Sequence, residues 1–549
     1  MFLHQALAVM AGILLMITFG LTFREFKNQK HRFLPLFIGM ALLILQGGAA
    51  ALYRTKGEIE WITGLHYLVA LAVLGLVLIH MTALFAGQKA ATSSGRLQSF
   101  FDMIRLGGFP RLVTGNALAI FLLLLSGIIA SLKDAGSVCF GWPICPELIT
   151  PSNLPAWVNL FHRLMTLLSA VLIARMFIKS WREFRGDTAI LVVATIVSVL
   201  FFSQVLMGMV ESARGYPAYL IGLHSVTSVS VWAAIVILTT LVWLRAPIHL
   251  KTIAIGCDVE RRNLKRLLLD YLMLTKPVVV LLLLVTTVAG MIVGAGEFPA
   301  LPTMTWTLLA GFLAAGGSSA INQYIDRYDD QKMQRTKKRP LPAGRLTPAE
   351  GLAFGVASVL ISFYVMVSLV NLVAALLTLA GAIYYVLIYS ILLKKSTVQN
   401  IVIGGGAGAI PPLVGWAAAT GGLNIPAMLL FAVVFFWTPP HFWALALVRR
   451  KDYARAGVPM LPVVRGEKET RWQIFLYTLQ LVILTLLLPI FGLGGSLYFI
   501  GAVILGAYLL LFAWRVWKNT GNKVAWQMYR HSSMYLAFLF LVLMFDALI

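Results

Sequence analysis

The sequence predicts an all-α polytopic membrane protein with about sixteen transmembrane helices. Of its 549 residues, 60% are hydrophobic and only 12% are charged, and the mean hydropathy is +0.86. Apolar runs long enough to cross a bilayer recur along the whole chain. Charged residues gather in the short segments between these runs, as they do in the loops of membrane proteins. This composition excludes a soluble globular protein.

The apolar runs define the predicted spans, and charged or turn-forming residues mark their ends. Seven spans precede the longest polar stretch, near 4–23, 33–52, 62–85, 112–131, 158–178, 188–210 and 220–244. Nine spans follow it, near 276–295, 305–325, 350–370, 372–392, 401–420, 425–447, 473–491, 496–514 and 530–548. The first run lacks a basic leader and a small-residue cleavage site, so we expect a retained helix rather than a signal peptide.

The net charge of +23 comes from bases that lie in alternate loops. Under the positive-inside rule, this alternation places the basic loops in the cytoplasm and both chain ends outside. The bases are spread over short loops between spans, so they indicate membrane orientation and no nucleic-acid partner. We therefore expect a multi-pass protein of the cell membrane, in contact with lipid.

A polar linker, 246–275, divides the chain into two predicted domains. It contains several charged residues, among them Asp258, Glu260 and Arg266. Residues 1–245 carry seven spans, and residues 276–549 carry nine. We expect the linker to lie on the cytoplasmic side.

The first domain contains an internal repeat of polar residues inside apolar runs. Each copy has a His, a Gln and a His, separated by gaps of 42 and 20 residues. The two sets are His4, Gln46 and His66, then His162, Gln204 and His224. Two copies of one helical unit explain the equal spacing.

The repeated histidines are candidate metal or haem ligands. Imidazoles inside a membrane are energetically costly and usually functional. Two histidines that face each other across a helix bundle suit the axial positions of a haem iron. The alternative for any single histidine is a hydrogen bond between helices. Zinc fits less well, because each copy supplies two histidines and no carboxylate at ligand spacing.

Cys139 and Cys145 are two of the three cysteines and lie in a predicted outer loop. Six residues apart in an oxidising compartment, they suggest a disulfide. A reactive or transiently metal-binding thiol pair is the alternative.

The first domain also resembles a known protein family. The segment 136–145 reads GSVCFGWPIC, and the dipeptide His162-Arg163 follows it; Gln204 and His224 come later. These features are similar to the haem A synthase family, which has two four-helix halves related by duplication. That family oxidises a methyl group of haem O to a formyl group.

The resemblance implies haem b as cofactor and four ligands for two haem sites. His162 and His224 would serve one haem, and His4 and His66 the other. It also marks Cys139 and Cys145 as the outer-loop cysteine pair. The chain departs from the family in having seven spans instead of eight. Asn159 stands where the family has an acidic residue, three positions before a ligating histidine.

The second domain has a charged motif at the end of its second span. Asn322, Asp326 and Asp330 are spaced four residues apart, so on one helix they share a face. Hard oxygen ligands of this kind suit Mg²⁺, which binds through one or two carboxylates together with substrate phosphates. The bases that follow, Arg335 and Arg339, suit the phosphates. The alternative is a solvated positive loop.

Two further cytoplasmic segments combine charges with glycine and proline. One contains Lys395 and the Pro411-Pro412 pair, and the other contains Pro439-Pro440 and Asp452. Glycine and proline at membrane depth are expected to break the helices, which is tolerated where backbone lines a cavity. Three such segments on one side of the membrane predict a pocket. Diphosphate departure needs Mg²⁺ and cations there to absorb the developing charge.

The motifs of this domain resemble the intramembrane UbiA-type prenyltransferase superfamily. Within it, the runs 322–340, 411–416, 438–443 and 452–462 are similar to haem O synthase, the protohaem IX farnesyltransferase family. The resemblance implies a nine-helix fold, with farnesyl diphosphate as donor and haem B as acceptor. It gives Asn322, Asp326, Asp330 and Asp452 catalytic roles. Asp326 and Asp330 would hold Mg²⁺.

Together the two resemblances imply a fused pair of consecutive enzymes. One half would make haem O, with Arg335, Arg339 and Lys395 binding diphosphate, and the other would convert haem O to haem A. Assembly factors of a haem–copper oxidase are possible partners. One alternative is a quinone-precursor prenyltransferase fused to a di-haem electron carrier. Another is a transporter with internal repeats.

Overall fold

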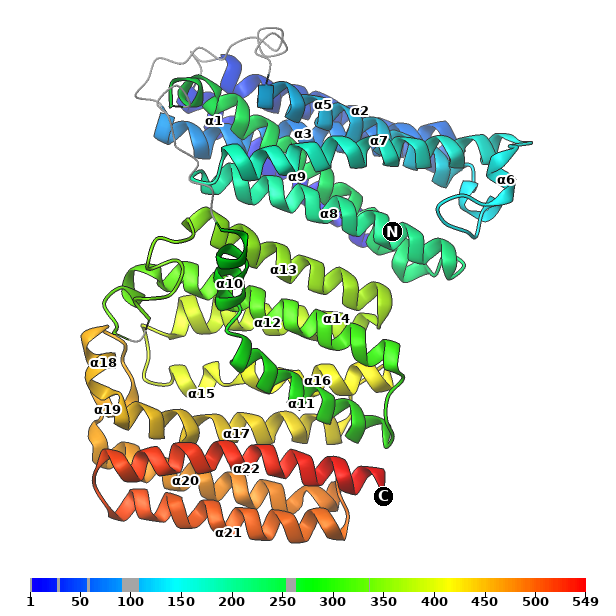
Figure 1. Cartoon of the computed structure of the whole chain (residues 1–549). Helices are drawn as coiled ribbons and strands as arrows, with labels where there is room; N and C mark the ends of the chain where they lie inside the picture. The colour runs from blue at the N-terminus through cyan, green and yellow to red at the C-terminus, as the bar shows by residue number, and fades with distance from the viewer. Residues whose placement is uncertain (1, 27–29, 57–59, 91–107, 253–262, 335) are drawn as a thin grey trace. The chain divides into compact units, whose positions relative to one another are not determined.

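The computed structural model describes residues 2–26, 30–56, 60–90, 108–252, 263–334 and 336–549. Arg335 and the side chain of His4 lie outside the described part. Every element in these ranges is a helix (Figure 1). Fifteen of the described helices are long and apolar enough to cross a membrane, and Ala8–Arg24 is a shorter apolar helix. Sixteen spans were predicted, and the first corresponds to α1, Phe2–Phe26.

The chain divides into two compact units, Met1–Arg261 (unit 1) and Arg262–Ile549 (unit 2). The division falls inside the polar stretch 246–275. That stretch is more ordered than a linker: α9 continues to Thr252, and α10 spans Leu264–Leu274. On α10, Leu264, Leu268 and Met273 are exposed. An exposed apolar face beside Lys265 and Arg266 is the pattern of a helix that lies along a membrane surface.

Unit 1 is a set of long helices with one small ordered loop. The long helices are α1 (Phe2–Phe26), α2 (Lys30–Lys56), α3 (Glu60–Ala90), α5 (Gly108–Leu132), α7 (Leu154–Glu183), α8 (Thr188–Ala213) and α9 (Ala218–Thr252). Two short helices, η1 (Ala135–Val138) and α6 (Pro146–Ile149), lie in the loop between α5 and α7. Helix α5 packs against α7 and α9, α7 against α8, and α8 against α9.

The repeat in unit 1 has a structural counterpart. Helices α1, α2 and α3 carry the first His, Gln and His, and α7, α8 and α9 carry the second set. In both copies the second and third helices pack together. Helix α5 completes the second copy as a four-helix bundle, and α3 packs against α9 to join the copies.

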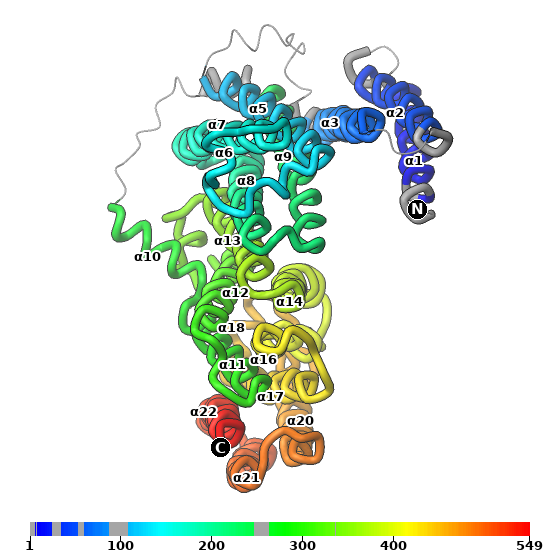
Figure 2. Tube along the Cα trace, turned by 90° about the vertical axis from the view of Figure 1, so that its right-hand side faces the viewer, coloured from blue at the N-terminus to red at the C-terminus, as the bar shows by residue number. Residues whose placement is uncertain are grey.

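Unit 2 consists of antiparallel helices connected end to end. After α10 come α11 (Pro277–Ala295), α12 (Leu301–Asp330), α13 (Pro348–Leu369), α14 (Leu372–Ile383) with the π-helical η2 (Tyr384–Leu393), α15 (Asn400–Gly404), α16 (Gly406–Thr420), α17 (Ile425–Val448), α18 (Arg450–Arg455), α19 (Leu461–Val464), α20 (Gly466–Leu487) with η3 (Leu488–Phe491), α21 (Ser496–Lys518) and α22 (Asn522–Leu548). Figure 2, viewed close to the helix axes, shows these helices side by side.

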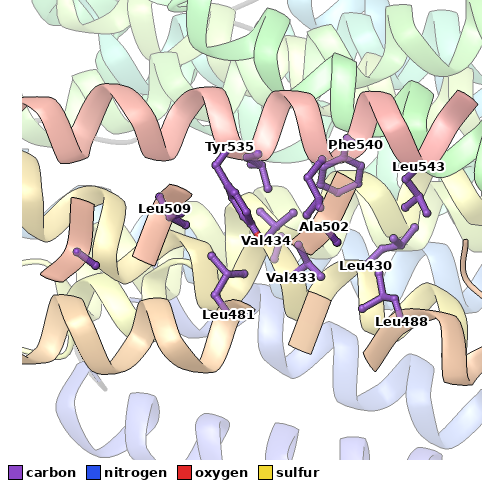
Figure 3. Packing of buried hydrophobic residues seen from close by; sticks show 14 of the residues in the cluster. Leu430, Val433, Val434, Leu481, Leu488, Ala502, Leu509, Tyr535, Phe540 and Leu543 are labelled. Atoms are coloured by element: carbon purple, nitrogen blue, oxygen red, sulfur yellow. The ribbon is translucent and has the colours of Figure 1, made fainter. Parts of the chain in front are cut away.

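Because the spans alternate in direction, the segments after α12, η2 and α17 meet at one end of unit 2 (Figure 1). An apolar core runs between α17, α20, α21 and α22. The side chains that pack together in this core include Leu430, Val434, Leu481, Tyr535 and Phe540 (Figure 3). This packing holds the helices whose ends carry the polar residues.

Helices α11 and α16 cross with their backbones in contact. A Cβ added to Gly415 would lie 1.9 Å from the carbonyl oxygen of Thr287, and one at Gly290 would lie 2.2 Å from that of Pro412. Small residues allow such close approach between membrane helices. No larger side chain fits at either glycine without separating the helices.

The expected helix breaks occur in one of the two proline segments. A break separates α15 from α16 near Gly405, before Pro411. In contrast, α17 runs unbroken through Pro439 and Pro440, so the predicted break there was wrong. Membrane helices tolerate internal proline where neighbouring groups satisfy the freed carbonyls. Helix α17 packs against α16, α20 and α22.

Candidate functional site

Unit 2 carries a buried polar face at the C-terminal end of α12. Asn322, Asp326 and Asp330 are 4%, 3% and 5% exposed. The Nδ2 of Asn322 donates a hydrogen bond to Oδ2 of Asp326, at 2.8 Å. The four-residue spacing brings the amide and the carboxylate together on successive turns. Buried carboxylates require compensating partners.

Two lysines from other segments supply those partners. Lys394, just after η2, forms an ion pair with Asp326. Lys276, just before α11, donates to Oδ1 of Asn322 at 3.1 Å and to the Tyr385 hydroxyl at 3.4 Å. Asn322 also donates to the Ser390 hydroxyl at 3.1 Å. Two cations therefore converge on one amide–carboxylate pair, the arrangement that a diphosphate needs.

Neither lysine was predicted from the sequence to be a site residue. Lys276 begins a span and Lys394 ends one, positions where a lysine usually marks the membrane interface. What separates them from interfacial lysines is the polar partner opposite. This partner is 46 residues away in the sequence for Lys276 and 68 residues away for Lys394. The spacing of residues along the sequence does not predict a contact between helices that are distant in the sequence.

The other predicted residues lie around this centre with their own partners. Arg339 donates to Asp330 at 2.7 Å, and the Thr336 hydroxyl donates to the carbonyl oxygen of Asp330 at 2.9 Å. Lys395 pairs with Asp329, a neighbour that the sequence interpretation did not use. Arg335 falls outside the described residues.

Asp452 stands apart from the α12 face. It lies on α18 and pairs with Arg455 at 3.4 Å. It also lines a cavity of about 180 Å³ whose other lining residues are Met333, Leu445, Arg449, Tyr453, Trp526 and Tyr529. Over the described ranges, no three His, Cys, Asp or Glu side chains group closely enough to hold a metal ion. Two carboxylates and an amide still fit Mg²⁺, because a bound diphosphate supplies the remaining oxygen ligands.

In unit 1, His162 lies on α7 and His224 on α9, and both helices belong to the second copy of the repeat. Each ring is backed by a glycine. A Cβ on Gly127 would lie 3.3 Å from Cε1 of His162, and one on Gly208 would lie 3.3 Å from Cε1 of His224. The Nδ1 of His162 and the Ser126 hydroxyl are 2.8 Å apart. Two histidines on facing helices, with space kept at their edges, fit a bis-histidine haem.

Glu211 is a buried acid beside this pair that the sequence interpretation missed. Its side chain lies on α8 and is 6% exposed, with Oε2 3.3 Å from Nδ1 of His224. Oε1 of Glu211 and Nδ1 of His224 have no hydrogen-bond partner among the described residues. Histidine ligands commonly have a carboxylate at the other ring nitrogen. The acid was missed because it is 13 positions from His224, on a different helix.

The glutamines of the repeat contact the later histidine in each copy. Gln46 lies 3.4 Å from Nε2 of His66, whereas Gln204 donates to the carbonyl oxygen of His224 at 3.0 Å. The atoms differ, but both pairs join the second and third helices of a copy. The side chain of His4 lies outside the described part.

Cys139 and Cys145 form a disulfide in the loop at this end of unit 1. Arg163, next to His162, donates to the carbonyl oxygens of Gly141 at 2.8 Å and Pro143 at 2.7 Å. The Ser212 hydroxyl, next to Glu211, lies 3.2 Å from the carbonyl oxygen of Cys139. The disulfide loop is therefore fixed to the two helices that carry His162 and Glu211.

Comparison with known proteins assigns the two halves to two families. Residues 1–236 match the model of a cytochrome oxidase assembly protein family, COX15-CtaA. Residues 283–541 match the UbiA prenyltransferase family. A solved structure described as a digeranylgeranylglyceryl phosphate synthase aligns with 51% of this chain and 98% of its own, at 18% identity and a TM-score of 0.45.

Curated relatives match one half or almost the whole chain. A protein named protoheme IX farnesyltransferase from Roseiflexus sp. is 39% identical over 88% of this chain and 91% of its own length. Another of that name from Symbiobacterium thermophilum is 51% identical over 50% of this chain and 93% of its own length. The chain is thus a multi-pass membrane enzyme of the protohaem IX farnesyltransferase family, with a UbiA-type prenyltransferase half preceded by a COX15-CtaA half.

Proposed function

We propose that the chain carries out two consecutive steps of haem A biosynthesis. Unit 2 transfers the farnesyl group of farnesyl diphosphate to a vinyl group of haem B, which gives haem O. Unit 1 then oxidises a methyl group of haem O to a formyl group, which gives haem A. The observation that carries the proposal is the convergence of Lys276 and Lys394 on the buried Asn322–Asp326 pair. The histidine pair of unit 1 supports the second step.

In the first step, the α12 face binds the diphosphate end of the donor. Asn322, Asp326 and Asp330 hold Mg²⁺, which neutralises the charge that develops on the leaving group. Asp452 acts from α18 as the fourth catalytic residue. The phosphate oxygens are bound by basic side chains: the predicted Arg335, Arg339 and Lys395, together with Lys276 and Lys394.

The lysine contacts explain how the site can exist without substrate. Lys394 compensates the Asp326 carboxylate, and Lys276 occupies the Asn322 carbonyl oxygen. When diphosphate binds, both ammonium groups can turn to its oxygens over a short distance. They then stabilise the electron pair that leaves with the diphosphate as the C–O bond breaks. The surrounding apolar helices exclude water from the farnesyl chain.

In the second step, unit 1 holds haem b as a resident cofactor. His162 and His224 bind one haem, and His4 and His66 bind another, as the repeat implies. A bound haem b supplies electron transfer for oxidation of the substrate methyl group. Glu211 would orient the His224 ring and leave its other nitrogen available as a haem ligand, and the disulfide loop closes the end of the bundle over this pair.

The charge pattern supports opposite orientations for the two sites. The basic segments after α12, η2 and α17 place the prenyl-transfer site on the cytoplasmic side of the cell membrane. The histidines and the disulfide lie at the ends of helices that face the outer side. An outer location also suits the disulfide, which persists in oxidising compartments.

The test is extraction and chromatography of haems from cells that make the wild type, Asp326→Ala or His224→Ala. We expect haem A from the wild type, only haem B from Asp326→Ala, and accumulated haem O from His224→Ala. Haem O in the Asp326→Ala cells would contradict the assignment of unit 2. Normal haem A in the His224→Ala cells would contradict the assignment of unit 1.

A further inference from the structure

The cavity beside Asp452 is a second binding site in unit 2, distinct from the α12 face. Its walls come from the end of α17, from α18, from the start of α22 and from Met333. Met333 lies three residues beyond Asp330, and its amide donates to the carbonyl oxygen of Asp330, at 3.4 Å. The cavity therefore borders the turn that follows the acidic face, and it shares Asp452 with the catalytic residues proposed above.

One wall of the cavity is aromatic and rigid. The rings of Trp526 and Tyr529 stack with centroids 5.2 Å apart. Behind them, Tyr529 lies 4.5 Å from the ring of His441, which stacks on Trp437 at 4.2 Å. The four rings form a continuous column whose outer end, Trp526 and Tyr529, faces the cavity. Flat aromatic surfaces of this kind favour contact with another planar π-system.

The column is fixed by hydrogen bonds from one residue of α22. The Ser532 hydroxyl lies 2.8 Å from Nδ1 of His441, and the Trp437 indole donates to the carbonyl oxygen of Ser532, at 2.7 Å. The aromatic wall is therefore held in place before any ligand arrives, and a preorganised surface loses little freedom on binding.

The cavity also contains a solvent-exposed cation, Arg449. Arg449 lines it, and no carboxylate in the described part of the chain pairs with its guanidinium. The neighbouring acid, Asp452, is directed to Arg455, and the neighbouring Arg450 is paired with Glu467 at 2.9 Å. An arginine left without a counterion at a cavity is suited to a carboxylate of a ligand, which it can bind through two parallel hydrogen bonds.

The size of the cavity decides which part of a ligand it can hold. At about 180 Å³, it is smaller than the roughly 300–1,000 Å³ of sites that enclose a whole drug-sized ligand. It can receive one edge of a larger planar molecule. In haem B the two propionates lie on one edge of the macrocycle and the vinyl groups lie toward the opposite edge. Binding by the propionate edge leaves a vinyl group free to reach the farnesyl donor.

We propose that this cavity binds the propionate edge of the porphyrin acceptor. Arg449 pairs with a propionate carboxylate, and Trp526 and Tyr529 contact the face of the macrocycle. The assignment rests on the proposed farnesyl transfer in unit 2 and adds the acceptor subsite to it. It places donor and acceptor on two sides of the turn that contains Met333.

The test compares the KM for each substrate, with membranes containing the full chain. For Arg449→Gln we expect the KM for haem B to rise about 10-fold, the value of a lost charge-assisted hydrogen bond. The KM for farnesyl diphosphate should stay unchanged, and Arg449→Lys should restore part of the affinity. The matched control is Lys451→Gln, which removes a charge two residues away that does not line the cavity. An equal rise of both KM values would overturn the assignment.

A second measurement changes the substrate and requires no further protein variant. Haem B dimethyl ester lacks the propionate charges, so the wild type and Arg449→Gln should use it with the same KM. If Arg449→Gln is still about 10-fold weaker with the ester, the arginine does not act through a propionate. If the wild type makes no haem O from either acceptor, the proposed function fails. If it makes haem O and Arg449→Gln keeps the wild-type KM, only the acceptor subsite fails.

Discussion

The acidic face of unit 2 and the histidine pair of unit 1 differ in how fully the chain satisfies its own buried polar groups. Asn322, Asp326 and Asp330 each have a basic partner from elsewhere in unit 2. In unit 1, Glu211, Gln204 and His224 keep buried atoms that make no hydrogen bond within the described residues. An unsatisfied buried polar group costs about 1–3 kcal/mol.

This contrast is what we expect of a substrate site and a cofactor site. A substrate site is empty between turnovers, so it must be stable with its own lysines in place of the ligand. A cofactor site is occupied throughout, so it can leave polar groups for the cofactor and its ligands to complete. The contrast predicts that mutations in unit 2 change rates, whereas mutations in unit 1 change occupancy. Four measurements test it, from the largest expected effect to the smallest.

Removal of a histidine from unit 1 should abolish haem binding there. Outer-shell partners alone are worth about 10–100-fold in metal affinity, so His162→Ala is expected to weaken haem binding by more than about 100-fold. The measurement is the absorption of reduced haem b per mole of purified protein. Ser126→Ala, which removes only a contact to the same ring, is the milder control. Full haem content in His162→Ala would show that His162 is no ligand.

Removal of a lysine from unit 2 should slow farnesyl transfer without unfolding the site. For Lys394→Met we expect a fall of about 100-fold in kcat, comparable to the loss of one preorganised charge-stabilising donor. The matched control is Lys332→Met, whose side chain is 67% exposed and pairs with Asp329 at 4.0 Å. An exposed pair contributes at most about 1 kcal/mol, so the control should lose no more than about fivefold. If the two lysine variants were equivalent in this assay, the distinction drawn from the ion pairs would be wrong.

Neutralisation of Glu211 should have a smaller effect on the same haem. In Glu211→Gln the negative charge 3.3 Å from Nδ1 of His224 is removed, so we expect haem affinity to fall about 10-fold and the reduction potential to rise. Redox titration followed by absorption measures both. Glu183→Gln, on the exposed side of α7, serves as control. A potential identical to the wild type would show that Glu211 does not act on the ring.

Loss of the disulfide should affect stability more than either activity. Cys139 and Cys145 close a short loop, and the chain-entropy model gives about 2 kcal/mol for a loop of this length. In Cys139→Ser, the hydrogen bonds from Arg163 and Ser212 still fix the loop, so the melting temperature should fall by only a few degrees. Thermal denaturation of purified protein checks this. Complete loss of folded protein would mean that these hydrogen bonds do not suffice.

Much of the architecture followed from the sequence because local signals determine it. Long apolar runs fix the spans, and the spacing of Asn322, Asp326 and Asp330 places them on one helix. The partners of these groups could not be found in this way. Lys276 and Lys394 reach the acidic face from the ends of other helices, and Glu211 reaches His224 across a helix boundary. These contacts depend on how the helices pack, which periodicity does not record.

The predicted helix break at Pro439 and Pro440 was also wrong, for a related reason. Pro439 and Pro440 predicted a break, but α17 continues through both residues and packs against α16, α20 and α22. The break near Gly405 was expected and is present. Whether a helix breaks at such residues depends on the groups that lie around the freed carbonyls. The sequence alone does not identify those groups, because helix packing determines them.

The crossing of α11 and α16 has a consequence for the route by which product leaves. With backbone against backbone at Gly290 and Gly415, no gap remains between these helices for an isoprenoid chain to pass sideways. The two helices must move as one body, because sliding either past the other would drive carbonyl oxygens into backbone atoms. A product anchored by a farnesyl tail must therefore enter the lipid through another seam of unit 2.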